Sequence, residues 1–412
     1  MNINIVGWGY TGIQLIKYLC RQQVQQNCSG NSVRYSTISE YEEPSEFGQD
    51  VAEFVVGCDA VCPNPMAADY VCNDIFRKNS GPGKLADTDM LIHLISLENT
   101  FSTGAARAFS NFLLREYCGK SPFQIALVLL PSLEEGAETA GRFLIQMTAA
   151  RHPCFDLVIL LDREGPLFRK ENLDVLDEYV HRFISLFTNL LPDSNLLHFL
   201  SKMDARFLSF SMTGTKTAMP DIFVEHLLKS LIEDHSTDLF DGEIRWPTGI
   251  QTIKAFPRVK KVREVFVIST PSGNYKEVET AYRKHIANVF VNADIFYLDF
   301  NGADLDENLR NQHILLLARP LTHKLLLIIR QYVEKYWGIS PRQFEKMLVF
   351  ENTGAPESLY ETVGWREKKF VKNYLTNMGK PITDTDYLLT DYGVSRQTLE
   401  TSLKLLSQWI QG

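Results

Sequence analysis

The strongest constraint on the fold is a regular alternation of short apolar segments with longer segments of helical periodicity. Three apolar runs have the length and composition of buried strands: 90–96, 125–130 and 156–162. The segments that follow them have helical spacing: 105–117, 135–151 and about 172–191. Strands that alternate with helices form a mostly parallel sheet covered on both faces. The chain is therefore predicted to be an α/β protein whose ligands bind beyond the carboxyl ends of its strands.

A second pattern begins after Pro192 and predicts a smaller α/β domain. Its predicted strands are 206–212, 262–270, 294–300 and 313–319. A short helix directly after Pro192 is also predicted, with longer ones at 221–233 and 276–288. The predicted division of the chain is a first domain with its long helix, a smaller α/β domain and a helical C-terminal extension: 1–191, 192–322 and 323–412. The last predicted helix, 395–410, is amphipathic.

Composition excludes several classes of protein. The 412 residues are 45% apolar and 22% charged, which excludes a disordered tail, a collagen-like fibre and a simple coiled coil. The net charge of −8 argues against direct nucleic-acid binding, which needs clustered Lys and Arg. The apolar runs fall far short of the roughly 20 residues that span a bilayer, so no membrane span is expected.

The N-terminal sequence and the cysteines indicate the compartment. The first residues, MNINIVGWGY, lack the charged start and long apolar centre of a secretory signal. The seven cysteines are an odd number, which favours reduced thiols over a disulfide framework. Cys58 and Cys62 are not followed by a second pair at zinc-site spacing, so no metal site is predicted. We therefore expect a cytoplasmic protein.

The first strand-like segment ends in a glycine-rich turn that is typical of phosphate binding. Gly7, Gly9 and Gly12 form G-x-G-x-x-G between this strand and a helix. Glycines let the backbone approach an anion, and a helix N-terminus offers N–H groups and the positive end of a dipole. Many tight strand-to-helix turns carry such glycines and bind nothing, so the motif alone leaves both interpretations open.

One interpretation of this turn is an NAD(P)-binding Rossmann enzyme. That class needs an acidic residue about 20 residues beyond the glycines, at the end of the second strand, to hold the ribose. A second strand can begin within 31–35, and Glu40 is the nearest acid beyond it. The spacing is loose, and no downstream pattern indicates a hydride-transfer site.

Several further segments resemble, in the correct order, the tubulin and FtsZ superfamily. The segments are the glycine loop GWGYTGIQ, the Asn-Pro loop CPNPMAADY, ENTFSTG at the GGGTGTG signature, the ribose loop LLPSLEEGAETAG, the strand end LVILLDREG, the core-helix segment LDEYVHRFISLF and the closing hairpin YLDFNGADLDENLR. The resemblance covers roughly residues 1 to 320. It implies a nucleotide-binding domain, one long core helix, a loop that reaches the next subunit and a smaller domain.

The resemblance also implies a guanine-nucleotide site for GTP or GDP, with Mg²⁺ only beside a triphosphate. It assigns the phosphates to Gly7, Gly9, Tyr10, Thr11, Gly12, Asn64, Ser102, Thr103 and Gly104. It assigns the ribose to Glu135 and the base to Gln14, Asp162 and Asp177. A carboxylate suits guanine because N1–H and N2–H₂ are both donors, so a bidentate acceptor rejects adenine. An alternative is that Asp162 and Asp177 are helix-capping or solvent-facing acids in a domain that binds nothing, and His93 is expected to be a core histidine.

The phosphate signature departs from the family at most of its glycines. The non-glycine residues are Glu98, Asn99, Thr100 and Phe101. We expect Phe101 to crowd a γ-phosphate and Glu98 to repel it. Side chains also restrict the positive φ angles that such loops use. Nucleotide binding is therefore expected to be weak, biased towards the diphosphate, or lost.

The loop after the long helix departs from the family as well. In FtsZ and tubulin this loop supplies acids that orient the attacking water on the next subunit. Here the two acid positions fall on Pro192 and Asn195, and Asp193 is the only carboxylate nearby. Asp193 and Asn195 are therefore the candidate catalytic residues, and hydrolysis is expected to be slow or lost.

The resemblance implies a protein that assembles with itself, head to tail, into cytoskeletal filaments. A heterologous interface of this kind gives open polymers because its rotation does not have to close. A first alternative is a degenerate tubulin-like scaffold that binds no nucleotide and docks a protein adaptor at its C-terminal helices. The Rossmann enzyme is the second alternative.

Overall fold

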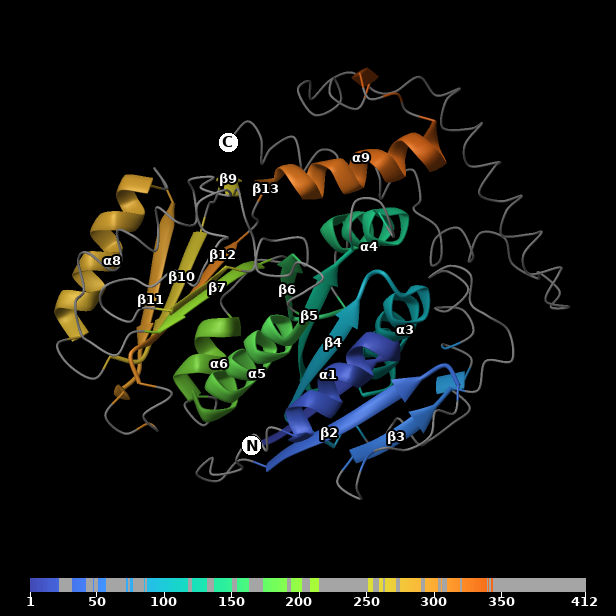
Figure 1. Cartoon of the computed structure of the whole chain (residues 1–412), viewed down its shortest axis with the longest axis horizontal. Coiled ribbons are helices and arrows are strands. Elements are labelled where there is room, and N and C mark those ends of the chain that lie inside the picture. The colour runs from blue at the N-terminus through green and yellow to red at the C-terminus, as the bar shows by residue number, and fades with distance from the viewer. Residues whose placement is uncertain are drawn as a thin grey trace, which may run out of the picture.

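The fold was analysed in a computed structural model of the chain (Figure 1). The structure describes residues 1–21, 32–41, 47, 51–56, 72, 75–76, 85, 87–117, 121–131, 137–149, 154–162, 173–190, 194–201, 208–214, 251–254, 259–261, 264–271, 275–289, 293–302, 305, 310–318, 321–338, 340 and 342–343. Among the described helices, none is both long enough and apolar enough to cross a bilayer.

The first half of the chain builds six parallel strands in the order β3-β2-β1-β4-β5-β6. They are β1 (Asn2–Trp8), β2 (Ser32–Ser39), β3 (Val51–Val55), β4 (Met90–Ser96), β5 (Phe123–Leu130) and β6 (Leu157–Asp162). The central strands are almost continuously apolar because both of their faces are covered. Edge strand β3 is apolar at four of its five positions but more exposed than the central strands, and the sequence pattern did not predict it.

Helices cover both faces of this sheet. The helices of the first half are α1 (Gly9–Arg21), α3 (Thr100–Glu116), α4 (Ala137–Ala149) and α5 (Leu173–Leu190). Apolar residues of α1 and α5 pack on one face in a core that includes Ile5, Leu94 and Leu127. Those of α3 and α4 pack on the other face, over Val6 and Ile95. Because successive side chains of a strand point to opposite faces, each strand contributes residues to two separate cores.

The second half of the chain extends the same sheet. Its elements are α6 (Ser194–Ser201), β7 (Leu208–Gly214), β8 (Gln251–Lys254), β9 (Val259–Lys261), β10 (Glu264–Ser269), α8 (Tyr275–Val289), β11 (Asp294–Asp299), β12 (Gln312–Ala318) and β13 (Leu321–Thr322). Strand β7 pairs in parallel with β6 over two residue pairs only, beginning with Ile159 and Leu208. The order then continues β7-β12-β10-β11, which puts β11 and β3 at opposite edges (Figure 1).

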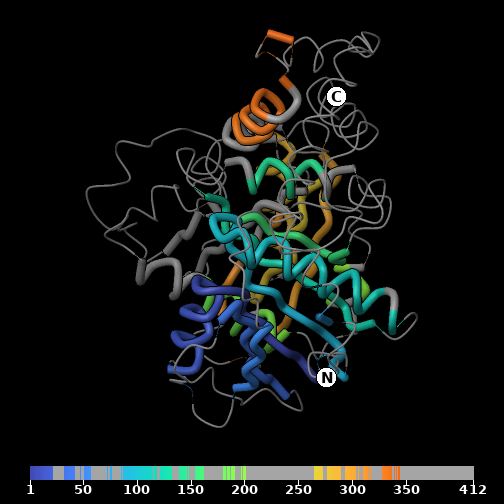
Figure 2. The backbone as a smooth tube through the Cα atoms, turned by 90° about the vertical axis from the view of Figure 1, so that its right-hand side faces the viewer, coloured from blue at the N-terminus to red at the C-terminus, as the bar shows by residue number. Residues whose placement is uncertain are grey.

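Helix α9 (His323–Trp337) returns from the second half to the first and packs against α4, as Figures 1 and 2 both show. The helices meet at Gly141, where a Cβ atom would lie 2.5 Å from Tyr332 Cβ and 3.0 Å from the Ile328 carbonyl oxygen. Ile328, Ile329 and Tyr332 are buried in the core under α4. The start of the predicted C-terminal extension is thus part of the same core as Val6 and Ile95. The predicted helix 395–410 lies outside the described residues.

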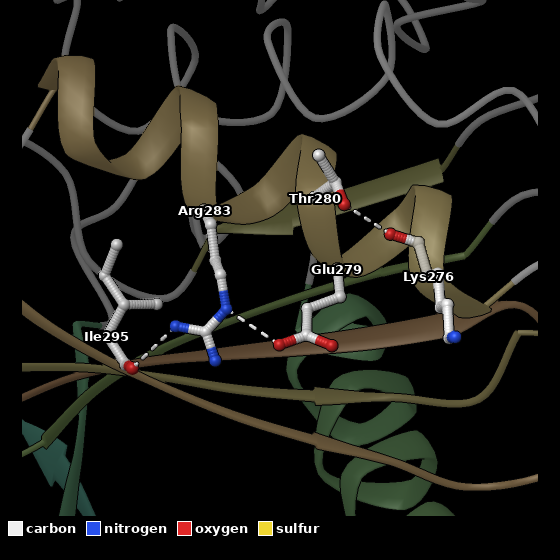
Figure 3. Close-up of polar contacts among 5 residues, drawn as sticks. All are labelled: Lys276, Glu279, Thr280, Arg283 and Ile295. Carbon is white, nitrogen blue, oxygen red and sulfur yellow. Dashed lines mark hydrogen bonds and ion pairs between the residues drawn. The ribbon is translucent and has the colours of Figure 1, made fainter.

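At the edge of the second half, α8 is tied to β11 by Arg283 (Figure 3). Its Nε lies 2.7 Å from Glu279 Oε1, and its Nη1 donates to the Ile295 carbonyl oxygen at 3.3 Å. One turn away, the Thr280 hydroxyl donates to the Lys276 carbonyl oxygen at 2.6 Å. Of these three exposed contacts, the one to Ile295 joins the helix to the edge strand, and the other two lie within α8.

Candidate functional site

The carboxyl ends of β1 and β4 bring two strand-to-helix turns together. The strands are neighbours, with Gly7 paired to Leu94. The turn after β1 leads into α1 at Gly9, and the turn after β4 leads into α3 at Thr100. A Cβ atom on Gly9 would lie 3.1 Å from Asn99 Nδ2 and 3.3 Å from Asn99 Cγ. The carboxamide of Asn99 therefore fills the gap between the two turns.

The three glycines of the first turn have different roles. A Cβ on Gly7 would lie 2.7 Å from Ile16 Cγ1, and one on Gly12 would lie 2.8 Å from the Leu94 carbonyl oxygen. Both glycines are therefore needed for α1 to pack on the sheet, whether or not a ligand binds. Gly9 is the one of the three with a positive φ, 61°, a conformation that favours glycine.

Neither Trp8 nor Gly9 supplies a side-chain acceptor at the start of α1. Gly9 has no side chain, and the indole of the preceding Trp8 can only donate. That N–H donates to His93 Nδ1 at 3.1 Å. Tyr10 is 63% exposed, and Thr11 and Gln14 are half-buried. An anion at this helix start would therefore not have to compete with a capping side chain from Trp8 or Gly9.

The second turn is capped by its own side chain. Asn99 adopts an extended conformation, with φ −96° and ψ 117°, and is the N-cap of α3. Its Oδ1 accepts the backbone N–H of Ser102 at 3.0 Å, and its carbonyl oxygen accepts the N–H of Thr103 at 3.2 Å. Asparagine is among the best N-cap residues because its side-chain oxygen satisfies a free N–H of the first turn. Helix α3 consequently begins five residues before the predicted start.

In this turn, the hydroxyl groups predicted to contact phosphate make hydrogen bonds to backbone carbonyl oxygens. The Ser102 hydroxyl lies 2.6 Å from the carbonyl oxygen of Ser96 and 3.0 Å from that of Asn99. The Thr103 hydroxyl donates to the Asn99 carbonyl oxygen at 2.9 Å. Ser102, Thr103 and Gly104 are all buried. The structure therefore places Ser102 next to Gly9, where an added Cβ would lie 3.4 Å from Ser102 Cβ, but the hydroxyl groups of Ser102 and Thr103 are directed to the backbone.

The expectation that Phe101 crowds a γ-phosphate is wrong. Phe101 is 1% exposed and belongs to the core under α3, together with Trp8 and Phe109. The reason is that the signature segment is helical from Thr100, which turns residue 101 towards the sheet. Glu98 precedes the helix and is exposed.

A buried chain of polar side chains runs from Trp8, at the end of β1, through His93 and Gln124 to Ser110 on α3. His93 Nδ1 accepts from Trp8, so Nε2 carries the proton and donates to Gln124 Oε1 at 3.1 Å. The Ser110 hydroxyl donates to the same oxygen at 2.8 Å. Burial lowers the pKa of His93 to about 4, and the hydrogen bond to Gln124 opposes this shift only partly. His93 is thus a neutral core histidine, as predicted, while the roles of Trp8 and Gln124 were not anticipated.

The residues expected to hold the base come from neighbouring elements. The rings of Tyr18 on α1 and His181 on α5 meet edge to face, with centroids 6.3 Å apart. Gln14 and Asp177 each lie four residues, about one helical turn, before a member of this pair. Asp162 ends β6, at the same sheet edge as the two turns. The backbone positions of these three residues are therefore compatible with one site.

The other predicted site residues are described only in part. Asn64, Glu135 and Asp193 lie outside the described residues. Asn195 is in the first turn of α6. Within the part of the chain that the structure describes, no three His, Cys, Asp or Glu side chains form a group that could hold a metal ion.

The fold is similar to solved structures of CetZ and FtsZ proteins. CetZ1 from Haloferax volcanii, solved as a GDP-bound monomer, is 14% identical over 81% of this chain and 99% of that chain, with a TM-score of 0.59. CetZ2 from the same organism, solved as a GTPγS-bound protofilament, is 16% identical over 81% and 98%, with a TM-score of 0.57. A mutant FtsZ from M. jannaschii is 14% identical over 77% and 91%, with a TM-score of 0.51. No protein-family model and no curated protein sequence matches the chain.

These similarities show that the chain has the tubulin/FtsZ fold, and they confirm the resemblance seen in the sequence. The first six strands alone would not decide this, because β3-β2-β1-β4-β5-β6 is also the order of dinucleotide-binding domains. Glu40, moreover, directly follows β2, where a dinucleotide-binding protein carries its ribose-binding acid. The long helix α5 and the second half of the sheet distinguish the two folds, since the similarity extends over about four fifths of the chain.

Proposed function

We propose that this chain is a guanine-nucleotide-binding protein that assembles head to tail into filaments and hydrolyses its nucleotide slowly or not at all. One observation carries the proposal. Gly9 and Asn99 meet at the carboxyl edge of a sheet whose fold is shared with a GDP-bound monomer and a GTPγS-bound protofilament. This edge is where parallel α/β sheets bind their ligands.

In this proposal the β1–α1 turn is the main phosphate anchor. The start of α1 has a bare glycine at Gly9 and no acceptor side chain on Trp8, so its N–H groups and dipole favour an anion. Tyr10, Thr11, Asn64 and Glu135 would complete the phosphate and ribose contacts. Gln14, Asp162 and Asp177 would hold guanine, with a carboxylate accepting from its N1–H and N2–H₂. Mg²⁺ would be held mainly through the phosphates of a bound triphosphate, which it would help to neutralise.

Self-assembly is supported by the similarity to a protein solved as a protofilament. In a head-to-tail filament, the segment that contains Asp193 and Asn195 would approach the nucleotide of the next subunit. An asparagine can hold a water molecule by hydrogen bonding but cannot take its proton, and Asp193 is the only carboxylate in this short segment. Slow or absent hydrolysis follows, which would favour long-lived filaments.

A scaffold that binds no nucleotide is the second candidate, and the capped turn at Asn99 favours it. Its Oδ1 already accepts the Ser102 N–H, and the hydroxyl groups of Ser102 and Thr103 face the backbone. A scaffold would keep the fold and its surfaces, with an adaptor docked at the C-terminal helices, and would have no use for the phosphate donors.

Assembly separates these two candidates. The full chain is incubated with GTP, GTPγS, GDP, ATP or no nucleotide, then sedimented and examined by negative-stain electron microscopy. The proposal predicts filaments with GTP and GTPγS that persist for as long as the triphosphate is present. Filaments that form equally without nucleotide would favour the scaffold. An absence of filaments under every condition would contradict self-assembly.

A further inference from the structure

We propose that Asn99 is a built-in competitor for nucleotide phosphate: its carboxamide occupies the α3 N–H donor that a phosphate oxygen would use, and nucleotide binding has to displace it. This inference rests on the proposed nucleotide binding and states how that site is regulated. It makes Asn99 a residue that sets affinity at this edge, although the residue has no counterpart among the predicted ligands.

The first observation is the chemistry of the cap. The first N–H groups of a helix have no partner within the helix, and an anion at the N-terminus is stabilised both by them and by the dipole. Asn99 Oδ1 accepts the N–H of Ser102 at 3.0 Å, as a phosphate oxygen would. A phosphate and this side chain therefore cannot use the Ser102 N–H at the same time.

The second observation is the position of the carboxamide. A Cβ atom on Gly9 would lie 3.1 Å from Asn99 Nδ2, so the amide group is in van der Waals reach of the β1–α1 turn. It lies in the gap between the two helix starts. A phosphate that contacts both turns would have to enter this gap. The cap is therefore an obstacle in space as well as a competitor for a hydrogen bond.

The third observation is that the neighbouring side chains cannot substitute for the cap. The Ser102 hydroxyl is committed to the Ser96 and Asn99 carbonyl oxygens, and the Thr103 hydroxyl to that of Asn99. Both residues are buried, whereas Asn99 is half-buried. The Asn99 side chain is thus the part of this turn that can rotate away with least disturbance of the core.

Three variants at this position separate competition from a structural role. Asn99→Gly removes the side chain, and glycine is tolerated at an N-cap at little cost. Asn99→Asp keeps the shape and the cap but adds a negative charge that repels phosphate. Asn99→Ser keeps a cap with a shorter side chain and no charge, so it tests the effect of side-chain size without a change of charge. Thermal unfolding of each variant establishes that it is folded.

The experiment is a titration of the full-length wild type and the three variants with fluorescent GTP and with GDP. Asn99→Gly is expected to bind at least about two-fold more tightly, because an asparagine cap is favoured over glycine by only a few tenths of a kcal/mol and the obstacle between the two turns is removed as well. Asn99→Asp is expected to bind at least about ten-fold more weakly than the wild type. Asn99→Ser should lie between the wild type and Asn99→Gly.

Equal affinities for all four proteins would overturn the competitor role and leave nucleotide binding intact. Weaker binding by Asn99→Gly would also overturn it, because Asn99 would then be a ligand contact. Failure of every protein, including Asn99→Gly, to bind at about 1 mM nucleotide would overturn the proposed function itself and the competitor role with it.

Discussion

The two turns that meet at the carboxyl edge of the sheet differ in whether their own side chains accept hydrogen bonds from the first N–H groups of the following helix. The β1–α1 turn has Trp8, whose indole can only donate, and Gly9, which has no side chain. The β4–α3 turn has Asn99, whose side chain accepts the Ser102 N–H. We call the first turn open, because neither Trp8 nor Gly9 has a side chain that caps α1, and the second turn closed, because Asn99 caps α3. A lost glycine signature can thus mean self-capping rather than a steric clash.

The largest expected effect tests whether the glycines of the open turn are structural. Gly12→Ala would put a Cβ atom 2.8 Å from the Gly7 carbonyl carbon and 2.8 Å from the Leu94 carbonyl oxygen, and these backbone atoms cannot move independently. We expect a loss of about 2–3 kcal/mol in the free energy of unfolding, measured by urea denaturation.

Gly338→Ala is the matched control for this prediction. Gly338 has a φ of 59° but no atom within 4 Å of an added Cβ, so only the backbone strain of roughly 1–2 kcal/mol should appear. Gly12 lies within α1 and does not have a positive φ, so a loss for Gly12→Ala no larger than that for Gly338→Ala would show that close packing does not demand glycine at position 12.

The second prediction concerns the buried polar chain that runs from Trp8 through His93 and Gln124 to Ser110. Burial holds the pKa of His93 at about 4, below its ordinary 6.5. The unfolded chain therefore binds more protons than the folded one, and stability present above pH 6.5 is lost as the pH falls towards 4. His93 alone should destabilise the fold by about 2 kcal/mol at pH 5 relative to pH 7. Buried His313, with its pKa lowered to about 3, adds a loss of the same sign.

His93→Gln isolates this contribution. Glutamine can still accept from Trp8 and donate to Gln124, but it does not titrate between pH 7 and 5. Urea denaturation at both pH values should show a smaller loss for the variant than for the wild type, by about 2 kcal/mol. Identical losses would mean that His93 does not titrate in this way on unfolding.

The third prediction measures the cap of the closed turn directly. Asn99→Ala removes the acceptor of the Ser102 N–H and should lower the free energy of unfolding by about 1 kcal/mol. Asn99→Asp retains an acceptor and should lose less. If alanine and aspartate proved equally stable to the wild type in urea denaturation, the cap would not stabilise α3.

The smallest effect is expected far from both turns. Arg283 and Glu279 form an exposed pair 2.7 Å apart, with side chains 48% and 38% exposed. Arg283→Ala should cost no more than about 0.5 kcal/mol, and a double-mutant cycle with Glu279→Ala should give a coupling energy of similar size. Nucleotide affinity should not change, since the pair lies at the β11 edge, whereas the turns lie at the ends of β1 and β4.

Most regular elements could be predicted from periodicity because each strand and helix of the core is long and strongly patterned. The long helix, predicted at about 172–191, is observed at Leu173–Leu190. Strand β3 was missed because it is only five residues long, and a short apolar run does not by itself distinguish a strand from another element. The predicted helix at 221–233 lies outside the described residues.

The candidate site was harder to predict than the fold. The start of α3 was predicted too late because the ENTFSTG segment was read as a loop, although Asn99 makes it a capped helix start. That reading also led to the wrong position for Phe101. The pairing of β7 with β6 could not be foreseen either, since two residue pairs leave no signature in the sequence.

The most direct test of nucleotide recognition is equilibrium binding of GTP and ATP to the full chain, compared among the wild type, Asp177→Ala and Asp87→Ala. Asp87 is a matched exposed control that precedes β4, at the amino edge of the sheet. We expect near one GTP per chain, much weaker ATP binding, a loss of at least about ten-fold for Asp177→Ala and no change for Asp87→Ala. No GTP binding at about 1 mM, or equal GTP and ATP binding that Asp177→Ala leaves unchanged, would contradict the proposal.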